Sequence, residues 1–254
     1  MIDPRPVPRR SILEIVHEWD AIASTRASQL QAGVDPSYDF VLKPAVLGLL
    51  EESEGESLLD VGCGTGVLTA EVARTVERVV AVDPSRASIE LAQQHAVQRG
   101  VDERIRWVID TVEGLASEST ESFDQVLANM TLMDVPDLRT ALAAVADLSH
   151  PGTRLVASIT HPWFWPRYWG YENADWFRYE AEIFIEAEFR ISNQRSRLLT
   201  THVHRPLEQY AGELARQGFR IDQITEPVPD EETSSLYQNP WKFPRFLVVR
   251  CVKD

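Results

Sequence analysis

The chain has 254 residues, 44% of them hydrophobic, which is enough for one sizeable core with elaborations. Its formal net charge of −14 argues against a nucleic-acid backbone as substrate, because phosphate binding requires clusters of basic side chains. No run of 18 apolar residues is present, so no membrane span is expected. Residues 1–10 lack the apolar run of a signal peptide, and Cys63 and Cys251 are typical of reduced thiols, so a cytoplasmic protein is expected.

Two helices are predicted before the first strand. Residues 11–32 have apolar positions at helical spacing, and Ser11 with Glu14 forms a capping-box pattern. A second helix is predicted at 44–51, followed by an acidic break up to Ser57.

The segment 58–66 reads LLDVGCGTG and runs from an apolar strand into a predicted helix at 67–75. Its alternating glycines allow a tight turn that a ligand can approach closely, and the unpaired N–H groups of a helix N-terminus follow. A pyrophosphate-binding loop fits poorly, because Asp60 would repel the phosphates and position 67 is valine where the dinucleotide fingerprint requires glycine. A ligand with an ammonium group and no phosphate suits Asp60 better. A dehydrogenase remains the rival at the level of the fold.

The next two strands also end in acids. Asp83 follows the strand 78–82 about 20 residues beyond the first glycine, the distance at which an acid meets a ribose diol in a βαβ unit. The alternative is an N-cap for the predicted helix 85–99. Pro84 suits the flat apolar edge of an adenine. Asp110 follows the strand 105–109, with a turn-forming aspartate as the alternative.

The rest of the core follows the same alternation. A strand is predicted at 123–128, an amphipathic helix at 135–148, a turn at Pro151-Gly152 and a fifth strand at 154–159. After residues 161–205, a helix at 207–217 ends at Gly218 and two strands follow at 219–225 and 246–252. Because ligands of open α/β sheets bind outside the carboxyl ends of the strands, the acids should converge there.

The segment 58–66, with acids after the next two strands and a Phe-Asp pair opening the fourth, resembles class I S-adenosylmethionine-dependent methyltransferases. The resemblance is firm over about residues 55–160 and loose elsewhere. It implies a Rossmann-like α/β fold with a seven-stranded mixed sheet flanked by helices. An N-terminal helical cap (1–50) and an insertion after strand 5 (161–205) would complete a single domain whose core is 51–160 and 206–254.

The resemblance also implies S-adenosylmethionine as the cofactor and a set of residues that contact it. Asp110 would accept from the adenine amino group, and Arg26 and Tyr38 are candidates for the methionine carboxylate, with a surface position as the alternative for each. The expected cofactor residues are Asp60, Gly62, Cys63, Gly64, Gly66, Asp83, Pro84, Asp110, Thr111, Val112, Asn129, Met130, Asp134, Tyr38 and Arg26.

The insertion is where we expect the acceptor to be selected. It opens with an aromatic run at 161–171, which suggests a lid that excludes water, with hydrophobic packing or a dimer contact as the alternative. The expected substrate pocket comprises Trp19, Met133, Trp163 and Trp165. Two strands flanking Ser192-Asn193-Gln194 would form a hairpin that extends the sheet or carries an interface between copies of the chain.

His161 follows the fifth strand and is the candidate general base, because methylation of a hydroxyl requires removal of its proton. The alternative is a histidine that bonds the backbone and orders the His-Pro turn. His202 and His204 would share a strand face, but no further ligands of suitable spacing accompany them, so no metal is expected.

The expected function is transfer of a methyl group to an N, O or C atom of a small molecule in secondary metabolism, such as antibiotic biosynthesis. A nucleic-acid methyltransferase that acts on exocyclic amines usually carries an Asn/Asp-Pro-Pro-aromatic loop, and residues 129–132 read NMTL instead. A protein methyltransferase and a non-catalytic protein that binds S-adenosylmethionine are further alternatives. We expect a small-molecule substrate, neither nucleic acid nor membrane as partner, and a possible homo-oligomer.

Overall fold

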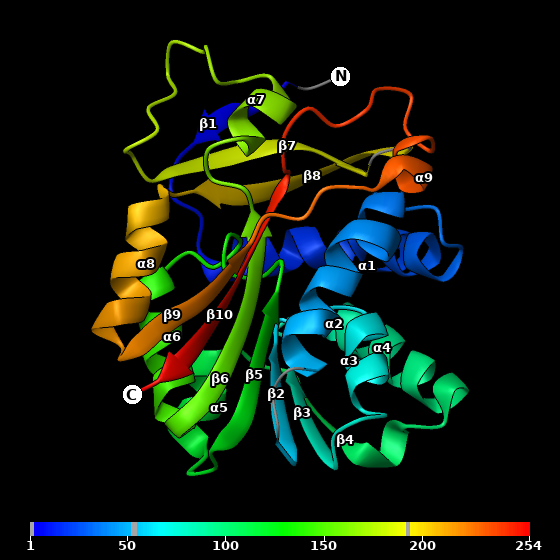
Figure 1. Ribbon diagram of the computed structural model, residues 1–254, viewed down its shortest axis with the longest axis vertical. Helices are drawn as coiled ribbons and strands as arrows, with labels where there is room; N and C mark the ends of the chain where they lie inside the picture. The colour runs from blue at the N-terminus through cyan, green and yellow to red at the C-terminus, as the bar shows by residue number, and fades with distance from the viewer. Residues whose placement is uncertain (1–2, 52–54, 192–193) are drawn as a thin grey trace.

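The computed structural model describes residues 3–51, 55–191 and 194–254 and contains two β-sheets (Figure 1). The larger has seven strands in the order β4-β3-β2-β5-β6-β10-β9. Its strands are β2 (Ser57–Val61), β3 (Arg78–Val82), β4 (Ile105–Val108), β5 (Phe123–Asn129), β6 (Ser149–Thr160), β9 (Phe219–Thr225) and β10 (Phe246–Lys253). β2 to β6 run parallel, whereas β10 is antiparallel to both β6 and β9. The predicted Rossmann-like mixed sheet is therefore confirmed.

Helices cover both faces of this sheet. Alternate residues of each strand point to opposite faces, so Leu59 and Val126 join one apolar cluster while Leu58 and Leu127 join the other. The first cluster contains α5 (Val112–Glu118), α6 (Leu138–Asp147) and α8 (Leu207–Arg216). The second contains α2 (Lys43–Glu51), α3 (Val67–Val72), α4 (Arg86–Arg99) and the short π-helix η1 (Tyr38–Leu42). The remaining helical segments are α1 (Ile12–Gln31), α7 (Trp165–Trp169), α9 (Glu231–Ser234) and the 3-10 turn η2 (Asp102–Arg104).

Several element boundaries differ from the sequence-based prediction. α3 ends at Val72, and α6 begins at Leu138 because Asp137 caps it by accepting from the backbone N–H of Thr140. β6 begins at Ser149 and includes the Pro-Gly pair predicted as a turn. Its pairing with β5 shifts register there, so the pair forms a bulge inside the strand. Part of the predicted acidic break, residues 52–54, lies outside the described residues.

The smaller sheet has the order β1-β7-β8 and comprises β1 (Arg5–Val7), β7 (Ile183–Ile191) and β8 (Gln194–His204). It confirms the predicted hairpin, although Ser192 and Asn193 of its turn lie outside the described residues. Of the two roles predicted for the hairpin, extension of the core sheet is not observed in the described residues. The hairpin pairs instead with β1, a strand that the sequence did not predict. Arg5 of β1 lies opposite Glu186 of β7, and the two side chains form an ion pair of 2.6 Å. We call β1, β7 and β8 the lid sheet.

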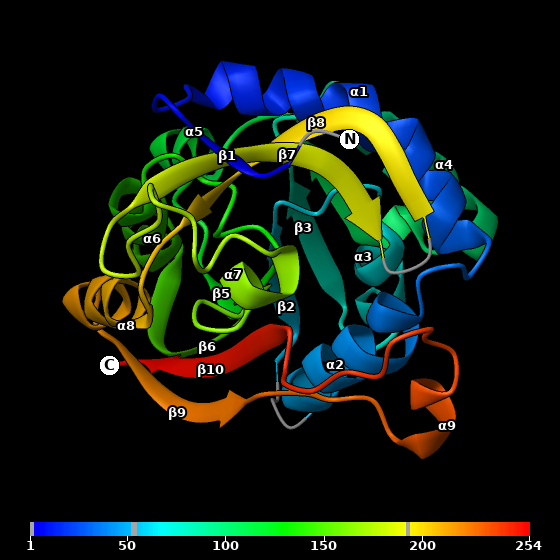
Figure 2. The same cartoon turned by 90° about the horizontal axis from the view of Figure 1, so that it is seen from above.

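The lid sheet lies across the carboxyl ends of the parallel strands, and from above β7 and β8 arch over the core beside α1 (Figure 2). Two contacts hold it there. The N–H of Val203 donates to the carbonyl of Met133 (2.7 Å) in the loop after β5. Arg205, 1% exposed, donates to the carbonyls of Leu132 and Val135 and to Glu182. The lid is therefore fixed to the core at the loop that follows β5.

α1 contacts both the lid sheet and the start of α4. Glu18 accepts from both the N–H and the hydroxyl of Thr201 in β8 (2.6 and 2.9 Å). Two residues along the helix, Asp20 accepts from the hydroxyl of Ser85 (2.6 Å) and from the N–H of Ala87 at the start of α4. The capping box predicted at Ser11 and Glu14 starts this helix.

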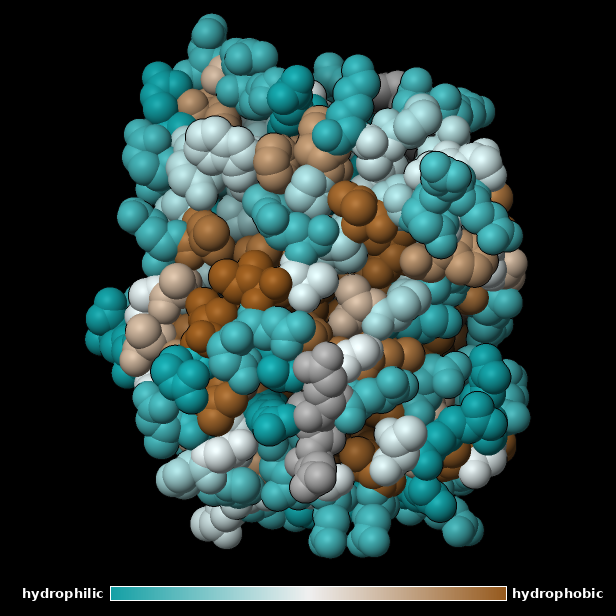
Figure 3. All heavy atoms as spheres, viewed as in Figure 1, coloured by the Kyte–Doolittle hydropathy of each residue, from teal (hydrophilic) through white to brown (hydrophobic). Residues whose placement is uncertain are grey.

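The outer surface carries apolar side chains around β9. The space-filling view shows them gathered on the face where β9 and β10 run in Figure 1 (Figure 3), and Ile224 and Val228 are each more than half exposed. Within the described part of the chain, no helix is both long and apolar enough to cross a bilayer.

Candidate cofactor and acceptor site

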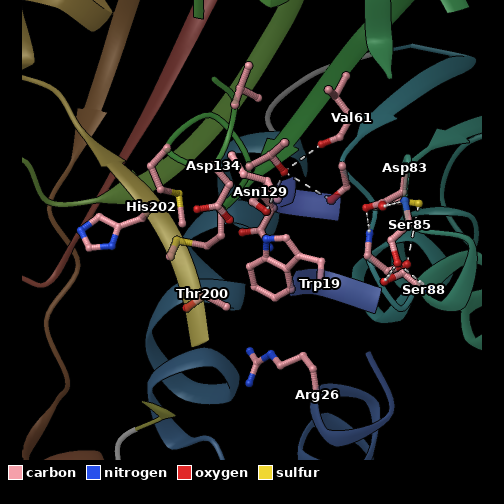
Figure 4. Close-up of a pocket in the computed structure, with 18 of the residues that line it drawn as sticks. Trp19, Arg26, Val61, Asp83, Ser85, Ser88, Asn129, Asp134, Thr200 and His202 are labelled. Atoms are coloured by element: carbon pink, nitrogen blue, oxygen red, sulfur yellow. Dashed lines mark hydrogen bonds between the residues drawn. The ribbon is translucent and has the colours of Figure 1, made fainter. Parts of the chain in front are cut away.

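A cavity of about 780 Å³ lies between the carboxyl ends of the parallel strands and the lid sheet. Its walls come from the loops after β2, β3, β4, β5 and β6, from α1 and η1, and from α7 and β8. Figure 4 shows Asp83, Ser85 and Ser88 on one side of it and Thr200 and His202 of β8 on the other, with Trp19 between them. The carboxyl edge of the sheet thus forms the floor that the topology predicts.

The glycine loop after β2 leaves one side of the cavity open. Gly62 and Gly64 have positive φ (68° and 54°), a conformation that favours glycine. A Cβ on Gly62 would collide with Thr131, whereas a Cβ on Gly64 would meet nothing within 4 Å. The backbone at Gly64 is therefore accessible to a ligand. Cys63 also lines the cavity, and burial raises the pKa of its thiol, so it stays protonated.

Asp60 and Asp83 both line the cavity without a cation beside them. Asp60 is 2% exposed and accepts from the hydroxyl of Thr69 (2.7 Å), and burial raises the pKa of Asp60 to about 7. Asp83 accepts from the N–H groups of Gly64 (2.9 Å) and Ser85 (2.8 Å), and burial raises its pKa to about 6. Within the described residues neither forms an ion pair with a basic side chain. A ligand that supplies an ammonium group and hydroxyl donors would meet this need.

Asp83 does not cap α4, the alternative that the sequence had left open. Ser85 does so, by accepting from the N–H of Ser88 (3.1 Å). Each carboxylate oxygen of Asp83 accepts one backbone hydrogen bond, which leaves lone pairs for further donors.

Two further loops contribute residues that the sequence predicted. Asp110, Thr111 and Val112 line the cavity after β4; Asp110 accepts from the N–H of Thr111 (2.7 Å), and a Cβ on Gly114 would collide with its carboxyl group. After β5, Met130 has a positive φ of 56°, and Asn129 accepts from the hydroxyl of Ser158 (2.8 Å). Pro84, Asn129 and Met130 also belong to the lining.

The N-terminal helices supply the next wall. Arg26 lies over the ring of Tyr38 (5.5 Å from the guanidinium carbon to the centroid) and forms an ion pair with Asp35 (2.7 Å). All three residues line the cavity, so neither Arg26 nor Tyr38 is the surface side chain of the alternative reading. Burial raises the pKa of Tyr38 above its ordinary value.

Asp134 and Trp19 occupy the middle of the cavity (Figure 4). The indole of Trp19 hydrogen-bonds to the carboxylate of Asp134. Burial, followed by the negative charge of Glu18, raises the pKa of Asp134 well above its usual range. The carboxylate of Asp134 therefore binds a proton more readily than an exposed one does.

The lid side is aromatic. The predicted pocket residues Trp165 and Met133 line it, together with Tyr168, Trp169, Thr200 and His202, which sequence reasoning missed. The alternation of β8 could have revealed Thr200 beside His202, since both lie on one strand face. Burial lowers the pKa of His202 to about 3, and its Nε2 lies 3.4 Å from the hydroxyl of Tyr171.

Three predicted site residues do not line the cavity. Gly66 lies against α4, where a Cβ would come within 2.6 Å of the Cβ of Ala92. Trp163 is 62% exposed and packs edge-on against Tyr179 (5.0 Å between centroids). His161 is buried behind the wall; its Nδ1 accepts from the N–H of Trp163 (3.2 Å), and its Nε2 lies 2.7 Å from Glu226. The geometry of His161 is that of the alternative role, ordering the His-Pro turn.

The remaining cysteine and histidine side chains are possible metal ligands by residue type. Cys63 and Cys251 are free thiols. Nε2 of His204 lies 2.9 Å from the carbonyl of Tyr179, and in the described residues no group of three His, Cys, Asp or Glu side chains could hold a metal ion.

Known proteins resemble this chain in both sequence and fold. A family model described as a methyltransferase domain matches residues 58–152. Ubiquinone biosynthesis O-methyltransferases are similar to part of the chain. The protein from Hahella chejuensis is 36% identical over 120 residues, which are 46% of this chain and 50% of that protein. The one from Cronobacter sakazakii is 32% identical over 157 residues, 60% of this chain and 63% of that protein. The chain thus spans about half the length of the curated relatives it matches.

Solved structures share the whole fold at low identity. A S-adenosylmethionine-dependent methyltransferase from Clostridium acetobutylicum superposes with a TM-score of 0.63 at 16% identity, covering 92% of this chain and 98% of that one. The 1,6-didemethyltoxoflavin-N1-methyltransferase of Burkholderia thailandensis gives 0.58 at 21% identity, with 99% of both chains covered. The cyclase SpnF gives 0.67 at 15% identity, with 98% of both covered. These likenesses establish the fold. In sequence, residues 58–152 are similar to a methyltransferase domain, and the fold of the whole chain is that of solved S-adenosylmethionine-dependent methyltransferases.

Proposed function

We propose that this protein transfers the methyl group of S-adenosylmethionine to a small organic molecule held under the lid sheet. The observation that carries the proposal is one continuous cavity of about 780 Å³ with an acidic end and an aromatic end. That volume is in the range of small-molecule sites. The match to ubiquinone biosynthesis O-methyltransferases, which act on a small molecule, supports the same reading.

The residues of the acidic end fit the parts of the cofactor. We assign the ammonium group to Asp60 and the glycine loop, the ribose diol to Asp83, the adenine to Pro84, Asp110, Thr111 and Val112, and the methionine carboxylate to Arg26 and Tyr38. Asn129, Met130 and Asp134 would lie along the methionine portion. Gly64 fits this assignment because the space beside its backbone is open. A side chain at this position would occupy the space that we assign to the cofactor.

The bound cofactor supplies an activated methyl group on a sulfonium, and the protein has to align the acceptor and keep water out. Such alignment can account for roughly 7–11 kcal/mol of barrier reduction. Trp19, Trp165 and the lid sheet would exclude water, which strengthens electrostatic contacts inside the cavity. Asp134 is the group at the centre that can take a proton from a hydroxyl acceptor, since His161 faces away. An amine acceptor with a free lone pair needs no such group.

The position of the cavity under the lid sheet and its volume of about 780 Å³ favour a metabolite over a nucleic acid or a protein side chain as the acceptor. The net charge of −14 also disfavours a nucleic acid as the acceptor, because its phosphates are negative. A role in secondary metabolism within the cytoplasm agrees with the aromatic lid and the long insertion. SpnF, named a cyclase, has the same fold, so cofactor binding and methyl transfer need separate tests.

The first test is binding of S-adenosylhomocysteine by titration calorimetry, with NAD as the comparison. We expect S-adenosylhomocysteine to bind and NAD not to bind. Asp83→Ala should weaken this binding about tenfold or more, because hydrogen bonds to a charged group contribute about 1.5–3 kcal/mol each. Asp147→Asn, an exposed position at the end of α6, is the control.

Unchanged affinity in Asp83→Ala, with a normal unfolding transition, would remove the ribose assignment. Binding of NAD in place of S-adenosylhomocysteine would overturn the proposed function itself. Methyl transfer is then measured with labelled S-adenosylmethionine against a panel of phenols, amines and organic acids.

A further inference from the structure

The aromatic end of the cavity contains a buried guanidinium, that of Arg245. Arg245 lines the cavity and is 8% exposed. Its guanidinium carbon lies 3.9 Å from the ring centroid of Tyr168 and 4.1 Å from that of Trp241. The charge is thus sandwiched between aromatic faces, and among the described residues no carboxylate forms an ion pair with it.

Burial of a guanidinium without a carboxylate beside it costs free energy, because the charge loses its hydration. Burial lowers the pKa of Arg245 from its ordinary value, and the charge of Arg190 acts in the same direction. Arg190 also lines the cavity, and its guanidinium carbon lies 4.8 Å from the ring centroid of Trp169 and 5.6 Å from that of Tyr168. Two cationic groups therefore lie around one phenol ring. Burial also lowers the pKa of His202 to about 3, so this neighbour is neutral and adds no further charge to this end of the cavity.

Two tryptophans of α7 complete this end of the cavity. Trp165 and Trp169 both line it, while their Nε1 atoms are buried away from the accessible surface. What the two residues offer a ligand is therefore apolar ring surface.

We propose that the methyl acceptor is an organic acid whose carboxylate binds Arg245 at the aromatic end of the cavity, while its apolar body packs on Tyr168, Trp165 and Trp169. The proposal rests on the proposed function and names its substrate class. A carboxylate fits because a guanidinium presents paired N–H donors in the same plane, and a planar acid can lie along the flat aromatic walls.

The position of Arg245 separates it from the cofactor acids. It directly precedes β10, whose first residue pairs with Thr160 at the end of β6. In the sheet order, β10 lies three strands from β2, which is about 14 Å at the usual spacing between strands. Arg26 on α1 is the guanidinium that we assign to the methionine carboxylate. Arg245 is therefore placed to hold the other reactant.

The test uses benzoate, 3-phenylpropionate and 2-naphthoate, each compared with its primary amide, which has nearly the same shape without the charge. Binding is measured by calorimetry with and without S-adenosylhomocysteine. We expect at least one acid to bind about tenfold or more tighter than its amide, because a charge-assisted pair contributes more than about 1.4 kcal/mol. In Arg245→Met this preference should disappear, and in Arg245→Lys it should be reduced.

Arg167→Met is the matched control, because Arg167 also lies over an aromatic ring, that of Phe243 at 5.4 Å, but outside the cavity. It should keep the preference for the acid. The proposal is overturned if no acid is preferred over its amide or if Arg245→Met keeps the preference. It is also overturned if Arg245→Met loses affinity for S-adenosylhomocysteine, which would assign the guanidinium to the cofactor. Failure of the native protein to bind S-adenosylhomocysteine would refute the proposed function alone, since the acid preference is also read without it.

Discussion

Both ring nitrogens of His161 take part in contacts that fix the loop after β6. Nδ1 accepts from the N–H groups of Trp163 and Phe164, so the proton is assigned to Nε2, which donates to Glu226. A histidine held through both ring nitrogens stabilises the loop around it. His161→Ala should lower the free energy of unfolding by about 1–3 kcal/mol, because two partly buried N–H groups lose their acceptor. Affinity for S-adenosylhomocysteine should not change.

Denaturant unfolding and calorimetry measure the two quantities. His17→Ala is the control, since His17 is exposed on α1. A His161→Ala protein as stable as the native one would show that these hydrogen bonds contribute little, and the histidine would again need another role.

At the scale of residues, the sequence predicted the acidic end of the cavity far better than the aromatic end. Asp60, Asp83 and Asp110 each end a parallel strand, so their position follows from local pattern and sheet topology. Arg245 gave no such signal, because it precedes an antiparallel strand and meets Tyr168 only through the fold. Contacts between residues far apart in the chain have no local periodicity to reveal them.

At the scale of elements, the lid sheet depends on α1. Glu18 accepts two hydrogen bonds from Thr201, and burial raises the pKa of Glu18 above its ordinary value. Glu18→Ala should loosen β8 without unfolding the core, because the core sheet contains no part of this contact. Amide hydrogen exchange at Thr201 and its neighbours in β8 should become about ten- to a hundredfold faster, since a charged partner contributes about 1.5–3 kcal/mol.

Glu90→Ala, at an exposed position of α4, is the control and should leave exchange in β8 unchanged. If amide exchange in β8 is as slow in the Glu18→Ala protein as in the native protein, the contacts with the loop after β5 are sufficient to hold the lid sheet. Acceleration throughout the core sheet would mean instead that α1 supports the whole molecule.

The lid sheet also shows where element prediction failed. Alternating side chains predicted β7 and β8, but not which sheet they would join, because a hairpin can pair with any available strand edge. The edge was supplied by residues 5–7, where two prolines flank a short segment that no propensity marks as a strand.

At the scale of the whole molecule, the order of strands and helices was predictable because each parallel strand alternates with a helix and fixes the next crossover. The same topology brings Asp60 and Asp83 together in a buried place. Burial raises the pKa of each, and the charge of Asp83 raises that of Asp60 further. Folding therefore creates a proton affinity that the unfolded chain lacks. This gives the molecule opposite pH dependences for stability and for binding.

The sign of the stability effect follows from the two raised pKa values, about 7 for Asp60 and about 6 for Asp83. The folded protein without ligand keeps these protons at a pH where the unfolded chain has lost them. Their contribution to stability is complete below about pH 4 and is lost as the pH rises through about 6 to 7. Binding of an ammonium group favours the ionised carboxylates, so affinity should change in the opposite direction.

Affinity for S-adenosylhomocysteine should therefore increase roughly tenfold from pH 6 to pH 8, the change in ionised fraction of one group with a pKa near 7. Asp60→Asn cannot ionise and should show a flatter profile, whereas Asp147→Asn should keep the native slope. Calorimetry across this range, together with thermal unfolding of the ligand-free protein, measures both trends. A profile that is flat in the native protein, or equally steep in Asp60→Asn, would separate Asp60 from the ammonium group and leave its raised pKa a consequence of burial alone.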